Sequence, residues 1–197
     1  MKKIIYIERK FWEWVSIEKV FRQIAEGLSP SRFQTAFQQV PYGNSLFGTI
    51  KNLLFFKKEP ADIYHVTGQI HYITLILPAK KTVLTIHDLR FLHDRKGLRR
   101  IVLKKLLLDW PVRKLRYITA ISDATKNEIM RYTKCDERKI RVIENPLRDE
   151  FVPSIEKPFD KTKPTLLQIG TTINKNIPNL IRAIDGLSCR LVIIGRI

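Results

Sequence analysis

The segment 82–92, which reads TVLTIHDLRFL, constrains the fold of this chain more than any other stretch. Thr82 to Ile86 is an uninterrupted run of β-branched and apolar residues, typical of a parallel strand that is covered on both faces. His87 and Asp88 follow where this run ends. Because open α/β sheets bind ligands outside the carboxyl ends of their strands, this titratable pair is a candidate functional site. The alternative is structural: Asp88 simply begins a turn.

Strand-like and helix-like segments alternate along the first part of the chain. Strands are expected at 3–7, 32–38, 62–66, 82–86, 117–121 and 140–143. Helices or helical turns are expected at 17–26, 44–57, 71–77, 96–115 and 123–132, with Ser16 and Ser122 as N-caps. This alternation predicts βαβ crossovers, and therefore an α/β fold with a doubly wound, Rossmann-like, mostly parallel sheet.

The pattern changes after Glu144, where four prolines interrupt a stretch with little periodicity. We therefore expect a first domain at 1–145, a proline-rich linker at 146–164 and a further segment at 165–197. In that last segment, strands at 165–169 and 190–194 flank a helix at 177–187, which makes one βαβ unit. A unit of this size buries too little surface to stand alone. It packs on the first domain, pairs with another chain, or is a partial second βαβ domain, truncated at Ile197, and we favour the last.

The charge of the chain indicates an anionic partner, because 36 Lys and Arg against 19 Asp and Glu give a net charge of +17. The segment 93–117 concentrates this charge, with nine basic and two acidic residues, or +7. Its apolar side is expected at Leu98, Ile101, Val102, Leu106 and Trp110, widened by Leu103, Leu107 and Leu108. The segment is either a crossover helix that covers the sheet or a helix that turns its cations toward an anionic membrane surface.

Other classes of protein are disfavoured by what the sequence lacks. The apolar stretch near the start ends at Glu8, too soon for a signal peptide, and no window is long enough for a spanning helix. Cys135 and Cys189 have no metal-ligand spacing and suggest no disulfide framework, so we expect a cytoplasmic location. The chain also has no helix-turn-helix spacing, zinc motif or RNP-type sequence, which argues against nucleic acid as the partner.

Five blocks, in this order and spacing, resemble bacterial family-four glycosyltransferases of the GT-B fold. They are VTGQIHY (66–72), TVLTIHDLRFL (82–92), ITAISDATKNEI (118–129), KIRVIENPLRDEF (139–151) and LLQIGTTINKNIPNLIRAI (166–184). The resemblance implies two Rossmann-like domains that face a cleft, the first for the acceptor and the second for a nucleotide-sugar donor. It implies transfer of a hexose-type sugar with retention to a glycan or lipid-linked acceptor, without a metal or any cofactor besides the nucleotide-sugar co-substrate.

The resemblance also assigns roles to individual residues. His87 matches the cleft histidine that touches the donor sugar or diphosphate, where an imidazole can donate to developing negative charge. Lys175 matches a basic residue that contacts the donor diphosphate, with Gly170, Thr171 and Thr172 beside it. Acceptor binding is expected at Arg9, Ser16, His71 and Tyr72. It is also expected at Trp12, outside the family pattern, because its ring, like that of Trp14, can stack on a sugar; the alternatives are a membrane interface or a cover over the core.

The sequence departs from the family at several points. Residues 8–14, ERKFWEW, replace the glycine-rich loop that many relatives have after the first strand. The family often has an arginine a few residues before the lysine that Lys175 matches, and residues 171–174 contain none. The paired glutamates that hold the donor are absent, so we expect this chain alone to be inactive. No Asp-x-Asp occurs, as expected for a metal-independent enzyme. Envelope polysaccharide synthesis at the inner face of the cell membrane is the expected setting. The competing classes are a basic nucleic-acid-binding protein and a non-catalytic Rossmann-like interaction module.

Overall fold

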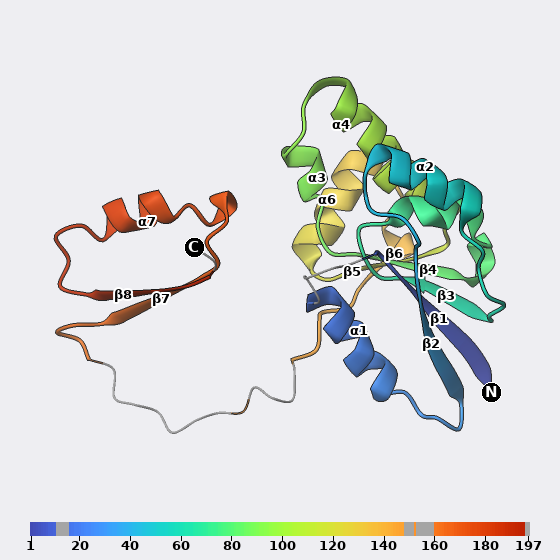
Figure 1. Ribbon diagram of the computed structural model, residues 1–197, viewed down its shortest axis with the longest axis horizontal. Coiled ribbons are helices and arrows are strands. Elements are labelled where there is room, and N and C mark those ends of the chain that lie inside the picture. The colour runs from blue at the N-terminus through green and yellow to red at the C-terminus, as the bar shows by residue number, and fades with distance from the viewer. Residues whose placement is uncertain (11–15, 148–151, 153–159, 196–197) are drawn as a thin grey trace. The chain divides into compact units, whose positions relative to one another are not determined.

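The computed structural model describes residues 1–10, 16–147, 152 and 160–195 (Figure 1). The chain divides into two compact units, Met1–Glu150 and Phe151–Ile197, and each unit is considered by itself. The expected boundaries at 145/146 and 164/165 remain predictions, since most of the expected linker lies outside the described residues.

The first unit is built on six parallel strands, which confirms the α/β, Rossmann-like, mostly parallel fold. The strands are β1 (Lys2–Glu8), β2 (Phe33–Gln39), β3 (Ile63–Val66), β4 (Thr82–Ile86), β5 (Tyr117–Ala120) and β6 (Ile140–Val142). Their order across the sheet is β2-β1-β3-β4-β5-β6. The order reverses direction at β1 and β3, and in doubly wound sheets such a switch point marks where ligands bind.

Helices cover both faces of this sheet (Figure 1). α1 (Ser16–Glu26) lies on one face, where Phe21 and Ala25 pack against Ile4 and Tyr6. The opposite face carries Ile5, Ile7, Leu84 and Ile86, together with the larger core cluster. The elements of this second layer are α2 (Leu46–Phe55), η1 (His71–Ile76), α3 (Arg90–His93), α4 (Gly97–Lys104), η3 (Lys105–Asp109), α5 (Trp110–Lys114) and α6 (Asp123–Thr133), with short turns η2 (Ala79–Lys81) and η4 (Glu137–Lys139).

The basic segment is helical as expected, and its predicted apolar side is correct in part. Four of the predicted residues reach the core, namely Leu103, Leu106, Leu107 and Leu108, and Val112 of α5 joins them. The others, Leu98, Ile101, Val102 and Trp110, are exposed. Between α4 and α5 lies η3, a π-helical turn, and such a turn adds a residue to the helical repeat. The side chains after the turn are therefore rotated relative to those before it.

The second unit is a single βαβ element with a two-stranded parallel sheet. It consists of β7 (Thr165–Ile169), η5 (Ile173–Lys175), α7 (Ile177–Ala183) and β8 (Arg190–Ile194). None of its described residues is fully buried, and Leu167 and Ile169 expose more than half of their surface. This unit therefore has the expected strands and helix but no core of its own among the described residues.

Candidate functional site

His87 stands directly after the carboxyl end of β4 and is half-buried. Its Nε2 lies 2.8 Å from the carbonyl oxygen of Thr67, which follows β3. A carbonyl oxygen only accepts, so Nε2 carries the proton in this arrangement. Burial lowers the pKa of His87, although the Thr67 carbonyl and nearby Asp88 act in the opposite direction. The imidazole is therefore neutral near pH 7 and can offer one donor and one acceptor nitrogen.

An ion pair lies at the same edge of the sheet, after β1. The Arg9 Nε donates to Glu18 Oε1 at 2.9 Å, and Nη2 lies 3.4 Å from Oε2, so the two groups form a two-pronged contact. The aliphatic part of Arg9 runs over Gly68, where an added Cβ would come within 3.7 Å of Arg9 Cγ. Both Glu18 and Arg9 influence the pKa of His87 through their charges. Arg9, Gly68 and His87 thus meet at the switch point of the sheet.

The sequence analysis missed Glu8, the last residue of β1. Glu8 is almost fully buried and pairs with Arg22 of α1 at 2.9 Å, while its Oε1 has no hydrogen bond among the described residues. Burial raises the pKa of Glu8, and the charge of Glu18 adds to the increase, against the lowering effect of Arg22. The rule that identified His87, a charged residue at the carboxyl end of an apolar strand, would also have found Glu8 and Arg9.

Asp88 does not orient His87 through a hydrogen bond recorded in the described residues. Its Oδ1 accepts from the backbone N–H of Arg90 and from the side chain of Gln69, both at 3.1 Å. Asp88 therefore organises the turn after β4, as expected. His87 is held from the other side by Thr125 of α6, whose hydroxyl donates to the His87 carbonyl at 3.1 Å.

The residues expected to bind the acceptor do not all lie together. Arg9 lies beside His87, Ser16 is exposed at the start of α1, and Trp12 falls outside the described residues. His71 and Tyr72 are buried. The Nδ1 of His71 bonds to the carbonyl of Leu107 at 2.5 Å, and the Tyr72 hydroxyl accepts from Asn52 at 2.8 Å. Both side chains thus have structural partners, and their part in acceptor binding stays a prediction.

The residues expected to bind the donor form one turn after β7 in the second unit. Gly170 has a φ of +90°, which favours glycine, and an added Cβ would lie 3.1 Å from Lys175 Cε. The Lys175 side chain therefore lies against Gly170. The backbone N–H of Lys175 donates to the Thr172 carbonyl at 2.8 Å, and the Thr172 hydroxyl donates to Asn174 Oδ1 at 2.6 Å. Thr171 lies close to Gly195, at the place where an added Cβ would stand. The structure thus brings Gly170, Thr171, Thr172 and Lys175 together in one turn.

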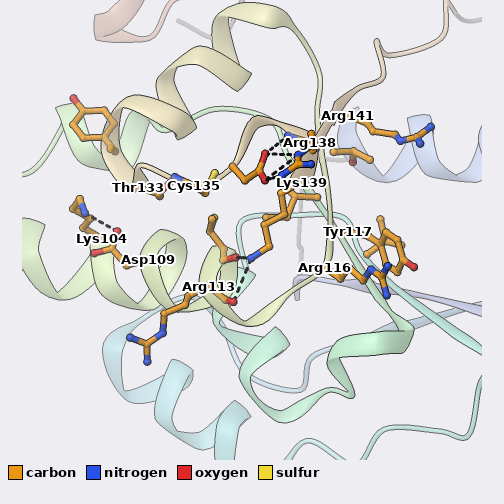
Figure 2. Close-up of a pocket in the computed structure, with 16 residues that line it drawn as sticks. Lys104, Asp109, Arg113, Arg116, Tyr117, Thr133, Cys135, Arg138, Lys139 and Arg141 are labelled. Atoms are coloured by element: carbon orange, nitrogen blue, oxygen red, sulfur yellow. Dashed lines mark hydrogen bonds and ion pairs between the residues drawn. The ribbon is translucent and has the colours of Figure 1, made fainter.

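A hollow of about 1160 Å³ lies at the opposite edge of the first sheet, near the amino ends of β5 and β6 (Figure 2). Six cationic and two acidic side chains line it: Lys104, Arg113, Arg116, Arg138, Lys139, Arg141, Asp109 and Asp136. Asp109 pairs with Lys104, and Asp136 pairs with Arg138. Because ligands of such sheets bind at the carboxyl ends, this hollow is not the candidate site. No group of three potential metal ligands is present among the residues that the structure describes.

Comparisons with known proteins place this geometry in context. The family described as Glycosyltransferase Family 4 matches residues 22–151, about two thirds of the chain. Among solved structures, the chain is similar to the Anabaena protein Alr3699/HepE, crystallised in complex with UDP and glucose. That match has a TM-score of 0.57 at 14% sequence identity and covers 99% of this chain and 69% of the other. No curated protein matches the sequence. At this identity the structural match establishes the fold alone.

Proposed function

Because the chain belongs to glycosyltransferase family 4, we propose that it takes part in transferring a hexose-type sugar from a nucleotide-sugar donor to a glycan or lipid-linked acceptor. The transfer retains anomeric configuration and needs no metal ion. The donor loses its nucleoside diphosphate, the acceptor oxygen bonds to the anomeric carbon, and the hydroxyl proton leaves with the diphosphate or to solvent. Envelope polysaccharide synthesis, with peripheral attachment to the inner face of the cell membrane, is the proposed setting.

The observation that carries this proposal is the position of His87. It stands at the carboxyl end of β4, next to the β1/β3 switch point, and Arg9 and Gly68 lie at the same edge. A neutral imidazole can give a hydrogen bond to a sugar hydroxyl or a phosphate oxygen without the desolvation cost of a buried cation. To do so through Nε2, it must exchange the Thr67 carbonyl for the ligand. Arg9, held by Glu18, places a guanidinium group near the same point.

The turn after β7 is the proposed diphosphate site. Gly170 allows the backbone to come close to a phosphate, the threonine hydroxyls can donate, and the Lys175 ammonium supplies charge. UDP-glucose is the first donor to test, because the similar Anabaena protein was crystallised with UDP and glucose.

Calorimetry with UDP-glucose tests this function and its site together. The chain should bind UDP-glucose, and Lys175→Ala should weaken that binding by roughly tenfold, the value of one charged hydrogen bond. Lys161→Ala is the matched control, since Lys161 is also exposed and lies outside the turn. His87→Ala should weaken binding as well, with His93→Ala as its control.

Two outcomes would contradict the proposal. One is equal affinity of Lys175→Ala, His87→Ala and wild type for UDP-glucose. The other is binding of single-stranded DNA with no response to any nucleotide-sugar, which would favour a basic nucleic-acid-binding protein. A chain that binds neither probe would fit a non-catalytic interaction module.

A further inference from the structure

Helix α2 has an unusual orientation, because most of its large apolar residues face outward and not toward the core. The buried residues are Gly48, Thr49 and Asn52, which are small or polar, and Leu53 beside them is partly buried against the core. Its outward side carries five large apolar residues, between 47% and 70% exposed: Leu46, Phe47, Ile50, Leu54 and Phe55. This set is called the apolar face of α2. Helices of soluble domains normally show the reverse arrangement, with the apolar stripe facing the core.

The inward side of α2 is well fitted, so the helix cannot simply be rotated. Asn52 is fully buried and makes three hydrogen bonds, two with the backbone of Tyr42 and one with the Tyr72 hydroxyl, all between 2.8 and 3.0 Å. Gly48 comes so close to Gly43 that an added Cβ would lie 2.1 Å from the Gly43 carbonyl oxygen. A turn of the helix that buried Phe47 would break these contacts. The exposure of the apolar face is therefore a built feature of the fold.

The residues in and around α2 carry mainly positive charge. Residues 27–58 contain no Asp or Glu, and Lys51, Lys57 and Lys58 lie in or just after α2. The acidic residue that follows them, Glu59, pairs with Lys3. The Lys51 ammonium lies 4.5 Å from the centre of the Phe47 ring, so the cation stands at the border of the apolar face. α4 adds exposed Leu98 and Ile101, with Arg99 and Arg100 between them. Figure 1 shows α2 and α4 on the same side of the sheet.

We propose that the apolar face of α2 inserts into an anionic lipid surface, with the lysines around α2 and the basic side chains of α4 in contact with the headgroups. Apolar side chains framed by cations are what a helix lying in a bilayer interface requires. A second copy of the chain is a poorer partner, since each copy carries a net charge of +17 and the residues around α2 are mainly cationic. Among the described residues, no helix is long and apolar enough to cross a membrane. The helix lies in the surface. The sequence alone offered membrane contact as one alternative for the basic segment and did not indicate α2.

Vesicle sedimentation tests the proposal. The chain should bind vesicles of phosphatidylglycerol and phosphatidylcholine, bind pure phosphatidylcholine weakly, and lose affinity as salt rises. Phe47→Ser, Ile50→Ser and Leu54→Ser together should lower affinity for the anionic vesicles by more than about tenfold, because three inserted apolar groups are removed. Lys57→Gln with Lys58→Gln should lower it less. Since these side chains are exposed, circular dichroism should show an unchanged fold.

A site-specific probe makes the test independent of affinity. In a variant with Cys135→Ser and Cys189→Ser, a polarity-sensitive fluorophore on Phe47→Cys should shift to the blue with anionic vesicles. The same fluorophore on Lys19→Cys, exposed on α1, should not shift. The proposal is overturned by full vesicle binding of the triple serine variant, by no binding of wild type, or by α2-dependent dimerisation in place of vesicle binding. It deepens the peripheral attachment proposed above, yet UDP-glucose binding is a separate measurement, so the two proposals can fail separately.

Discussion

Helices α1 and α2 cover opposite faces of one sheet and have nearly equal lengths, but they use their amphipathicity in opposite ways. α1 buries Phe21 and Ala25 against β1, and its Glu18 forms the ion pair with Arg9 beside His87. α2 buries Gly48, Thr49 and Asn52 and leaves its apolar face outside. The difference shows that apolar spacing identifies a helix without saying which side of it meets the core. Here one helix serves the ligand site, and we assign the other to a lipid surface.

The largest effect should come from the same substitution made on both helices. Phe21→Ala empties a buried site next to Tyr6 and should lower the free energy of unfolding by about 3–5 kcal/mol. Phe47→Ala removes a ring that is 67% exposed and should change it by less than about 0.5 kcal/mol. Urea unfolding of both variants measures this. Equal losses would mean that α2 is packed against something in solution.

The free energy of unfolding should depend on pH through His71, which lies in η1, the element on which α2 packs. Burial lowers the pKa of His71 from 6.5 to about 4, although the Leu107 carbonyl acts in the opposite direction. As the pH falls from about 6.5 to about 4, His71 takes up a proton in the unfolded chain but stays neutral in the folded chain. The folded state should thus lose up to about 3 kcal/mol over this range from His71. His71→Asn keeps a donor for Leu107 and does not titrate, so its unfolding free energy should depend less on pH. Parallel profiles for the two proteins would show that His71 is not buried as described.

A smaller difference in stability is expected between alanine substitutions at two glycines. An alanine at Gly48 has no room beneath α2, and Gly48→Ala should cost about 1–3 kcal/mol despite the better helix propensity of alanine. At Gly27, just after α1, an added Cβ meets only ordinary contacts at 3.6 Å and beyond. Gly27→Ala should therefore stay within about 0.5 kcal/mol of wild type. If Gly48→Ala is also neutral, α2 does not sit as close to Gly43 as the structure shows.

Local sequence signals predicted the fold well, because they act within one element. The run Thr82–Ile86 is strand β4 with the same bounds, and Ser122 caps α6 by accepting from the Thr125 N–H at 3.2 Å. In the 44–57 stretch, the apolar spacing predicted a helix, and α2 lies there. Its orientation could not be predicted, because it depends on how closely Gly48 and Asn52 fit beneath the helix.

Other features could not be predicted, because they depend on contacts between distant residues. The π-turn η3 precedes Pro111, which has no N–H to donate to the Leu107 carbonyl four residues earlier; His71 bonds to that carbonyl. No periodicity reveals such a partner 36 residues away. The ion pair between Arg9 and Glu18 likewise needs α1 to be placed on the sheet. In the candidate site, His87 and Glu8 could be found from the ends of their strands, whereas the part of Glu18 became visible only in three dimensions.

Nuclear magnetic resonance of the imidazole groups tests the central claim, that His87 stands in a ligand site at the carboxyl edge of the sheet. The chain has four histidines, His65, His71, His87 and His93, so each signal can be assigned by substitution. On addition of UDP-glucose, the His87 signals should move in a saturable manner, as Nε2 exchanges the Thr67 carbonyl for the ligand, while the buried His71 signals stay in place. Unchanged His87 signals at a UDP-glucose concentration that saturates binding by calorimetry would contradict the account.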